Sequence, residues 1–396
     1  DLFMHLLGDI TVDEFLRDYW HKKPLLIRNA WPDFEPLLGA DELAGLSLEQ
    51  EIESRIVMEN GPDGPWSIRK GPFSEADYGG LPEEKWTLLV QAVDHWIPEA
   101  SDLLQHFSFL PGWRIDDLMI SYAVDGGSVG PHSDQYDVFL LQAEGQREWR
   151  IGQMCTEQTP ILQGPKIRIL DSFEETDRWV LNPGDMLYLP PQLAHWGISR
   201  GECQTYSIGF RAPSVAELGQ SLLDQLLRTA SEDQRYADPD LTSDEGNGEI
   251  SIKAKQRLKA LLTEQLLTDE MLSDTLGRLM TEGKYPELQA EKFTESDWDN
   301  WRSQQPQLPV LRKAEHARFA YATQPDQTLV FYAQGLRWEL SSDDRTLAEA
   351  LCKESDYPEG FFSQIECTEP GYELIKALWL HQLITELAGD DLNGEL

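Results

Sequence analysis

The spacing of apolar residues changes twice along the chain, and each change marks a different kind of structure. The first part mixes helical and strand-like spacing. Residues 11–20 follow a helical pattern behind a capping threonine, and residues 24–28 form a short apolar run that predicts a strand. Residues 53–58 and 66–69 flank turn-forming residues and predict a hairpin. Residues 86–96 have helical periodicity, so we predict a helix there.

Between about residues 114 and 211 the pattern changes to short runs of β-branched and aromatic residues. Gly, Pro, Asp and Asn interrupt these runs every 8 to 12 residues or so, which is typical of a sandwich or barrel. Roughly eight such strands in two facing sheets would form a jelly roll. The predicted strands are residues 118–124, 138–142, 148–151, 167–170, 178–181, 185–189 and 206–210.

After residue 213 leucines recur at steps of three and four residues, which predicts helices. An acidic stretch at residues 231–249 interrupts the pattern. Such a stripe either packs within the chain or forms a subunit interface, and the sequence leaves both possibilities open. The residues of the stripe are Leu218, Leu222, Leu226, Leu227, Leu258, Leu261, Leu262, Leu266, Met271, Leu272, Leu276 and Leu279.

The last part combines strands and helices in a pattern compatible with a winged helix. Residues 329–332 and 336–340 flank a glycine turn and predict a hairpin, and residues 346–353 and 372–387 predict helices. Residues 301–396 hold 8 Lys and Arg against 16 Asp and Glu, a net charge of 8 − 16 = −8, which disfavours DNA binding. We therefore expect three domains, over residues 1–213, 214–305 and 306–396.

Composition narrows the class of protein. In 396 residues, 40% hydrophobic content supports packed cores, and no apolar run approaches the roughly 18 residues of a membrane span. Residues 1–4 do not begin a secretion signal, so we expect a cytoplasmic protein. Its four cysteines are scattered and predict neither a zinc site nor a disulfide framework. The net charge of −37 repels nucleic acid and favours a basic partner, although any acidic, soluble protein has the same property.

Candidate metal ligands occur within the strand-rich part. His132 and Asp134 follow a Gly-Pro turn and precede a strand-like run, which is how a rigid β-scaffold presents two ligands to one metal. Of the eight histidines in the chain, only His195 also falls in this part. Two imidazoles and one carboxylate are the set that binds Fe(II) in non-haem oxygenases and leaves positions open for substrate and O2. We therefore predict an iron site at His132, Asp134 and His195.

A cation for an acidic cosubstrate is the next candidate. By the two-residue period of a strand, Arg147 shares a face with Trp149 and Ile151, whose apolar side chains favour the interior. A buried arginine is costly unless it meets a carboxylate, such as the distal carboxylate of 2-oxoglutarate. An arginine at the sheet edge, paired with Glu148 or another acid, is the alternative that spacing leaves open.

Several segments together resemble the bacterial ribosomal oxygenases, which are JmjC-type, cupin-like, 2-oxoglutarate-dependent hydroxylases. The resemblance covers residues 1 to about 213, and the helical and C-terminal blocks agree in order and size. The segments that carry it are Trp20-His21-Lys22-Lys23-Pro24-Leu25, Trp113-Arg114-Ile115-Asp116-Asp117-Leu118-Met119-Ile120-Ser121, Gly130-Pro131-His132-Ser133-Asp134-Gln135-Tyr136-Asp137-Val138-Phe139 and Ile208-Gly209-Phe210-Arg211-Ala212-Pro213.

This resemblance implies an α+β chain. A double-stranded β-helix catalytic domain is followed by a helical dimerisation domain and a winged-helix domain that need not bind DNA. It further implies hydroxylation, with Fe(II), 2-oxoglutarate and O2, of the β-carbon of an arginine in the large-subunit ribosomal protein L-sixteen. The iron triad is carried to His132, Asp134 and His195, and the 2-oxoglutarate cation to Arg147. The partners implied are a basic ribosomal protein and a second copy of the chain, with no membrane.

One position departs from the family. Relatives have a serine that assists the arginine where this chain has Ala123, and we expect Ser121, Tyr122 or Ser207 to substitute for it. On the substrate side, Asp117, Met119, Ser121 and Ala123 share one face of their strand.

If that face points inward, Asp117 is a candidate acceptor for a substrate guanidinium, or else a carboxylate that holds a turn. Met119 and Tyr136 are candidates to line the same cleft. A JmjC-type lysine demethylase, which shares the iron residues, and a non-catalytic cupin-like binding protein are the alternative functions.

Overall fold

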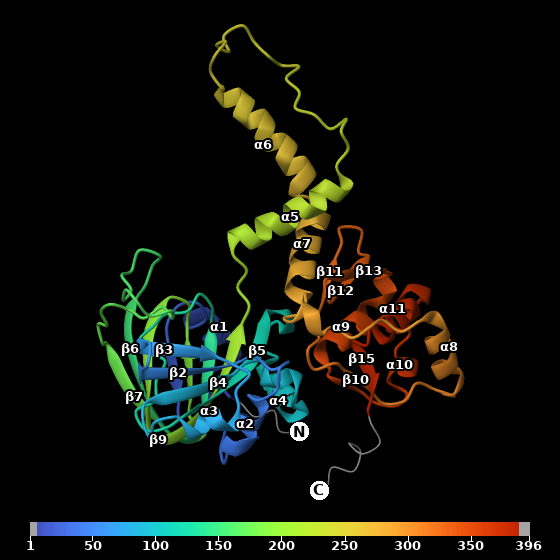
Figure 1. Cartoon of the computed structure of the whole chain (residues 1–396). Helices are drawn as coiled ribbons and strands as arrows, with labels where there is room; N and C mark the ends of the chain where they lie inside the picture. The colour runs from blue at the N-terminus through green and yellow to red at the C-terminus, as the bar shows by residue number, and fades with distance from the viewer. Residues whose placement is uncertain (1–5, 388–396) are drawn as a thin grey trace. The chain divides into compact units, whose positions relative to one another are not determined.

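The computed structural model describes residues 6–387, which form two compact units that divide between residues 212 and 213 (Figure 1). The expectation about residues 1–4 lies outside the described residues. The boundary between the units lies next to the boundary expected after residue 213. A further division near residue 305 stays a prediction.

The first unit is built on one antiparallel sheet of nine strands (Figure 1). Their order is β1-β8-β6-β9-β5-β4-β2-β3, and β7 pairs with β6. The strands are β1 (Leu25–Ile27), β2 (Ser54–Gly61), β3 (Gly64–Lys70), β4 (Trp86–Val90), β5 (Ile115–Ala123), β6 (Val138–Met154), β7 (Asp177–Leu181), β8 (Met186–Leu189) and β9 (Leu193–Phe210).

Two long strands, β6 of 17 residues and β9 of 18, make this sheet continuous. They pair from Val138 opposite Gly209 to Met154 opposite Leu193, with irregular register between Gln142 and Gln146. The predicted strands at residues 138–142 and 148–151 are therefore two halves of β6, joined through this irregular stretch. Because the two long strands pair over most of their length, the strands of the predicted jelly roll form one continuous hydrogen-bonded sheet.

Two predictions of local structure in this unit are wrong. Residues 86–96 form strand β4 and a short 3-10 helix (Val93–His95) instead of a helix. All five residues of β4 are buried between β2 and β5, and a short apolar run takes its structure from such neighbours. Residues 167–170 form no strand, and only Leu170 makes an isolated bridge, to Ile161.

The two faces of the sheet bury different kinds of residue, as the two-residue period requires. Leu118 and Ile120 of β5 point into the main apolar core, which also contains Phe15, Leu43 and Leu103 of the N-terminal helices. Met119, between them, points to the opposite face and into a cavity. The helices are α1 (Val12–Asp18), α2 (Ala40–Leu46), α3 (Glu75–Gly79) and α4 (Pro98–Leu104).

The second unit begins with the predicted helices, α5 (Val215–Thr229), α6 (Ile252–Leu266) and α7 (Asp269–Thr281). Residues 231–249, between α5 and α6, form neither helix nor strand. Helix α6 has no buried residue among those described, and two of its leucines, Leu258 and Leu262, are exposed. None of the helices in residues 6–387 is both long enough and apolar enough to cross a membrane.

Up to residue 387, the rest of the second unit contains two three-stranded sheets, and α8 is followed along the chain by three further α-helices. The predicted hairpin is formed by β12 and β13, and β11 adds a third strand. The predicted helix at residues 372–387 ends early, because Gln382 turns the chain with a positive φ and Ile384 then pairs with Lys313. The elements are α8 (Glu295–Ser303), β10 (Leu311–Lys313), β11 (Phe319–Thr323), β12 (Leu329–Ala333), β13 (Leu336–Leu340), α9 (Arg345–Lys353), β14 (Asp356–Tyr357), α10 (Phe361–Gln364), α11 (Glu369–Leu380) and β15 (Ile384–Glu386).

Candidate active site

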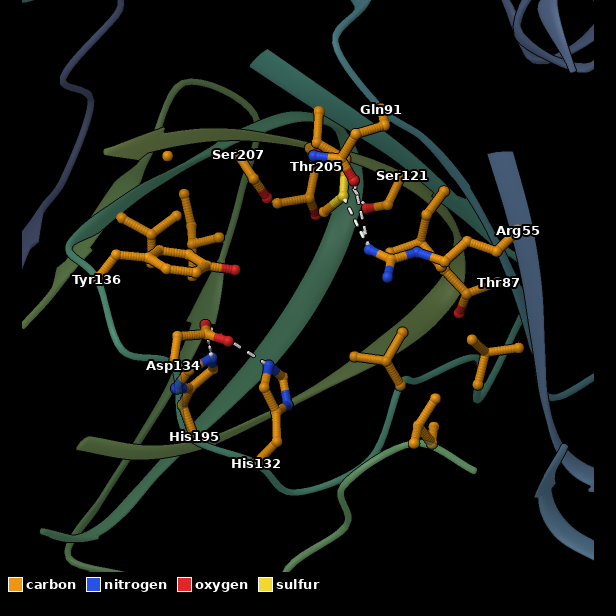
Figure 2. A pocket seen from close by; sticks show the side chains of 18 of the residues that line it. Arg55, Thr87, Gln91, Ser121, His132, Asp134, Tyr136, His195, Thr205 and Ser207 are labelled. Carbon is orange, nitrogen blue, oxygen red and sulfur yellow. Dashed lines mark hydrogen bonds and ion pairs between the residues drawn. The ribbon is translucent and has the colours of Figure 1, made fainter. Parts of the chain in front are cut away.

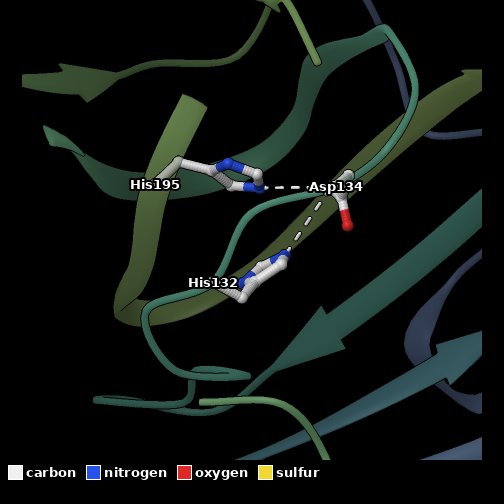
Figure 3. A group of neighbouring side chains, drawn as sticks. All are labelled: His132, Asp134 and His195. Atoms are coloured by element: carbon white, nitrogen blue, oxygen red, sulfur yellow. Dashed lines mark ion pairs between the residues drawn. The ribbon is translucent and has the colours of Figure 1, made fainter. Parts of the chain in front are cut away.

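The structure brings the three predicted metal ligands together on one side of the sheet (Figure 3). His132 and Asp134 come from the segment between β5 and β6, and His195 comes from the start of β9. Asp134 Oδ2 lies 3.7 Å from His132 Nε2 and 3.4 Å from His195 Nε2. The three ligand atoms all lie within 4.8 Å of one another, so a single ion can contact all of them.

Backbone contacts hold both imidazoles in this orientation. His132 and His195 exchange two backbone hydrogen bonds of 3.0 and 2.8 Å, which joins the loop to the strand. His132 Nδ1 lies 2.9 Å from the carbonyl oxygen of Gly130, and His195 Nδ1 lies 2.9 Å from that of Leu193. Since a carbonyl oxygen only accepts, each Nδ1 carries the proton, and each Nε2 is left with a lone pair for a metal.

Gly130 is required by the turn that leads into His132. Its φ is +82°, which side chains with a Cβ rarely adopt, and an added Cβ would lie 2.6 Å from Ile169 Cδ1. The glycine allows the chain to turn against residues 167–170 and still present His132 to the site.

The electrostatics of the three groups suit metal binding. Burial alone would raise the pKa of Asp134, but the neighbouring His132 and His195 outweigh it and lower this pKa to about 2. Burial, followed by the proximity of His195, lowers the pKa of His132 below its ordinary value. The site therefore offers one carboxylate and neutral imidazole at neutral pH, which is the protonation state that metal ligands need.

A cavity of about 390 Å³ opens beside these ligands (Figure 2). Val57, Leu89, Val138 and Leu140 supply part of its apolar wall. Polar and charged side chains supply the rest of the lining, including both ends of the cavity at Asp134 and at Arg147. A metal held by the three ligands would therefore keep one side open to this space, as a catalytic ion requires.

Arg147 lines this cavity and is almost fully buried. The predicted inward face of its strand is confirmed, since Arg147, Trp149 and Ile151 are 3%, 5% and 1% exposed. The guanidinium lies over the Trp149 ring, 5.1 Å from its centroid. Glycine at position 197 makes room for it, because an added Cβ there would lie 2.5 Å from Arg147 Nε.

The partners of Arg147 leave its charge uncompensated. Its Nη2 donates to the carbonyl oxygen of Gly197 at 3.3 Å and its Nη1 to Cys203 Sγ at 3.8 Å, while its Nε has no hydrogen-bond partner. No carboxylate within residues 6–387 pairs with it. The alternative of a pair with Glu148 does not occur, because Glu148 points to the other face and contacts Arg150 and Arg200. A buried, unpaired cation fits the carboxylate of a ligand.

Of the three residues predicted to assist Arg147, two lie in the cavity and one lies outside it. Ser121 and Ser207 line the cavity, and Ser121 Oγ donates to the carbonyl oxygen of Thr205 at 3.3 Å. The prediction for Tyr122 is wrong, because the alternation of β5 places it on the opposite face. There its hydroxyl donates to Glu202 Oε1 at 2.6 Å.

The three predicted substrate residues also border the cavity. Tyr136, which is 42% exposed, points into it, and nearby Asp134, followed by burial, raises the pKa of its hydroxyl. Met119 lies on the facing strand. Asp117 is 3% exposed, and its Oδ2 accepts hydrogen bonds from Gln91 Nε2 at 2.7 Å and from the backbone N–H of Ala92 at 2.8 Å. Asp117 therefore stabilises the turn after β4, independently of any role in binding the substrate.

Sequence reasoning missed Arg55, Thr87 and Gln91, which line the same cavity (Figure 2). Arg55 Nη2 donates to Gln91 Oε1 at 3.4 Å and contacts Met119 Sδ at 3.7 Å. Thr87 and Gln91 fall in the stretch predicted as a helix. The β-branched residues at both ends of Thr87-Leu88-Leu89-Val90 are the signal that favours a strand there.

Comparison with known proteins places this geometry in context. Residues 102–218 match the family model described as JmjC domain. The chain is 37% identical over 272 residues to the ribosomal protein uL16 3-hydroxylase of Escherichia coli, covering 69% of this chain and 72% of that protein. It is 38% identical over 281 residues to a probable ribosomal oxygenase of Haemophilus influenzae, covering 67% of each.

A solved structure agrees over almost the whole length. The ribosomal oxygenase YcfD from Escherichia coli, in complex with cobalt and 2-oxoglutarate, superposes with a TM-score of 0.79 at 31% identity. The match covers 96% of this chain and 98% of that one.

Proposed function

The chain belongs to the JmjC-domain ribosomal oxygenases, and we propose on this basis that it is an Fe(II)- and 2-oxoglutarate-dependent hydroxylase of a ribosomal protein. Its substrate in this proposal is an arginine of the uL16 protein, hydroxylated at the β-carbon. The observation that carries the proposal is one cavity that holds both an open His-Asp-His ligand set and a buried arginine without a carboxylate partner.

Each part of the cavity has a distinct task in this reaction. His132, Asp134 and His195 hold the metal through two neutral donors and a single negative charge, and Arg147 holds the distal carboxylate of 2-oxoglutarate. When bound, the metal and 2-oxoglutarate with O2 supply the oxidising chemistry, in which the cosubstrate becomes succinate and CO2. The apolar wall excludes water, and the rigid strands fix the distance between the two ends of the cosubstrate.

The substrate side of the cavity is formed by Met119, Tyr136 and Asp117. Met119 and Tyr136 offer apolar surface for the methylene groups of an arginine side chain. Asp117 adds negative potential, and its carboxylate is the group that we assign to the guanidinium. The net charge of −37 favours encounter with a basic ribosomal protein through long-range attraction.

Turnover with purified uL16 tests this proposal. We expect the protein to gain the mass of one oxygen atom at an arginine, with one succinate formed for each hydroxylation. His132→Ala and Asp134→Ala should abolish both while the circular dichroism of the fold is retained. Undiminished succinate formation by either variant would contradict the iron assignment, and loss of a methyl group in place of oxygen gain would favour the lysine demethylase alternative.

The exposed leucines of the second unit support a homodimer as part of the proposal. Leu227 of α5 is 71% exposed, and Leu258 and Leu262 of α6 are 46% and 41% exposed. Leu272 and Leu276 of α7 are exposed as well. Several large apolar side chains on neighbouring helices are unusual for a monomer surface, and a second copy would cover them. A ribosomal substrate also supports a cytoplasmic location as part of the proposal.

A further inference from the structure

Three buried polar atoms that lack a hydrogen-bond partner belong to residues lining the candidate active site. They are Thr87 Oγ1, Arg147 Nε and Trp149 Nε1. The arginine and indole nitrogens can only donate, and the threonine hydroxyl can donate as well. Because a buried donor without an acceptor is costly, the three atoms together fit a ligand rich in acceptor oxygens.

The sheet register aligns Thr87 with the arginine end of the cavity. Thr87 of β4 is directly opposite Ala123 of β5, and Ala123 is directly opposite Cys203 of β9. Residues directly opposite each other in antiparallel strands point to the same face, so the three side chains form one row. Arg147 reaches the end of this row, since its Nη1 lies 3.8 Å from Cys203 Sγ.

Ala123 is the small member of this row and brings no polar group to it. Its methyl group is fully buried between Thr87 and Cys203. Thr87 itself is 0% exposed, so its hydroxyl cannot be satisfied by bulk solvent. Figure 2 shows Thr87 on the Arg55 side of the cavity, across from His132 and Asp134.

We propose that Thr87 donates its hydroxyl hydrogen to the distal carboxylate of 2-oxoglutarate and, with Arg147, forms the anchor of this cosubstrate. The inference rests on the proposed function, because it requires 2-oxoglutarate to occupy the cavity. Thr87 takes the place of a hydroxyl at position 123, supplied from the neighbouring strand. It acts as a cosubstrate-binding residue, across the cavity from His132 and Asp134 (Figure 2).

The test measures binding without turnover. Calorimetric titration of the anaerobic, Mn(II)-loaded protein gives the Kd for 2-oxoglutarate and for 2-oxopentanoate, which has the same chain length but lacks the distal carboxylate. Thr87→Val keeps the branched shape and removes the hydroxyl, and Thr87→Ser keeps the hydroxyl. Thr385→Val is the matched control, because it makes the same change at an exposed strand residue of β15 that does not line the cavity, and it should bind both oxo acids like the wild type.

We expect Thr87→Val to weaken 2-oxoglutarate binding roughly tenfold, as loss of one hydrogen bond to a charged group does, and to leave 2-oxopentanoate binding unchanged. Thr87→Ser should bind like the wild type, and adding Ala123→Ser to Thr87→Val should recover most of the lost affinity. Equal Kd values for 2-oxoglutarate in wild type and Thr87→Val, or equal losses for both oxo acids, would overturn the role of Thr87. If the wild-type protein with Mn(II) binds no 2-oxoglutarate, the proposed function itself fails.

Discussion

Replacing Gly197 by alanine tests how closely the site is packed around Arg147. Gly197 lies on β9 directly opposite Trp149 of β6. An added Cβ would lie 2.5 Å from Arg147 Nε and 2.7 Å from the Trp149 ring. The φ of Gly197 is not in the left-handed region, so alanine brings no backbone strain and the effect is purely one of space.

The magnitude depends on which neighbour moves. If Arg147 and Trp149 stay in place, overpacking should lower the free energy of unfolding by about 1–3 kcal/mol. If the guanidinium shifts instead, it loses one charge-assisted hydrogen bond to the ligand carboxylate, worth about 1.5–3 kcal/mol. That loss corresponds to a Kd for 2-oxoglutarate that is about tenfold to 150-fold weaker.

Urea unfolding and 2-oxoglutarate titration of the Mn(II)-loaded protein measure both outcomes in the same samples. Gly45→Ala is the matched control, because Gly45 is an exposed glycine of α2 with nothing within 4 Å of its added Cβ. The control should gain about 0.5–1 kcal/mol of stability and bind 2-oxoglutarate unchanged. Wild-type stability together with wild-type affinity in Gly197→Ala would refute the assigned packing.

Three further predictions concern the metal, pH and assembly. Asp134→Asn keeps the shape of the ligand but removes its charge and should weaken Mn(II) binding at least about 100-fold by equilibrium dialysis; unchanged binding would exclude Asp134 as a ligand. Burial lowers the pKa of Lys313 from 10.5 to about 8, so between these pH values the unfolded chain binds a proton that the folded chain lacks. The free energy of unfolding should therefore rise from pH 8 to 10.5 in urea titrations, and Lys313→Met should remove this rise. The same dependence of stability on pH in both proteins would contradict the prediction. The double variant Leu227→Glu, Leu262→Glu should convert a dimer to a monomer in light scattering. Leu241→Glu, in the loop between α5 and α6, is the control and should leave the dimer intact. A dimer that persists in the double variant would place the interface elsewhere.

Much of the site could be predicted because its residues lie close together in sequence or follow a strict period. The His-x-Asp spacing and the single other histidine of the β-rich part indicated the three residues that the structure brings together. The period of two correctly placed Arg147, Trp149 and Ile151 inside the sheet. The same period, applied to β5, places Tyr122 on the face opposite that of Asp117, Met119 and Ser121, so Tyr122 and Ser121 could not both have faced the cavity.

The remaining residues depend on contacts between distant parts of the chain. Residues 86–90 are buried because β2 and β5 flank them, and because we predicted a helix there, the cavity-facing positions of Thr87 and Gln91 were missed. Likewise, residues 382–387 leave the helical pattern because Ile384 pairs with Lys313, about 70 residues earlier in the chain. The β-branched Thr87 and Val90 are a weak local signal for the first pairing, and the second pairing has none, so the sequence pattern predicts the metal ligands but not the opposite wall of the cavity.

The most direct test of the proposed activity is the mass of uL16 purified from cells. Ribosomes are isolated from cells of the source organism that carry either the wild-type gene or the Asp134→Ala variant in its place. With the wild type, we predict that uL16 carries one added oxygen, which fragmentation locates at the β-carbon of a single arginine, and that the variant strain lacks it. Identical uL16 masses in the two strains would contradict the proposal that this chain hydroxylates uL16.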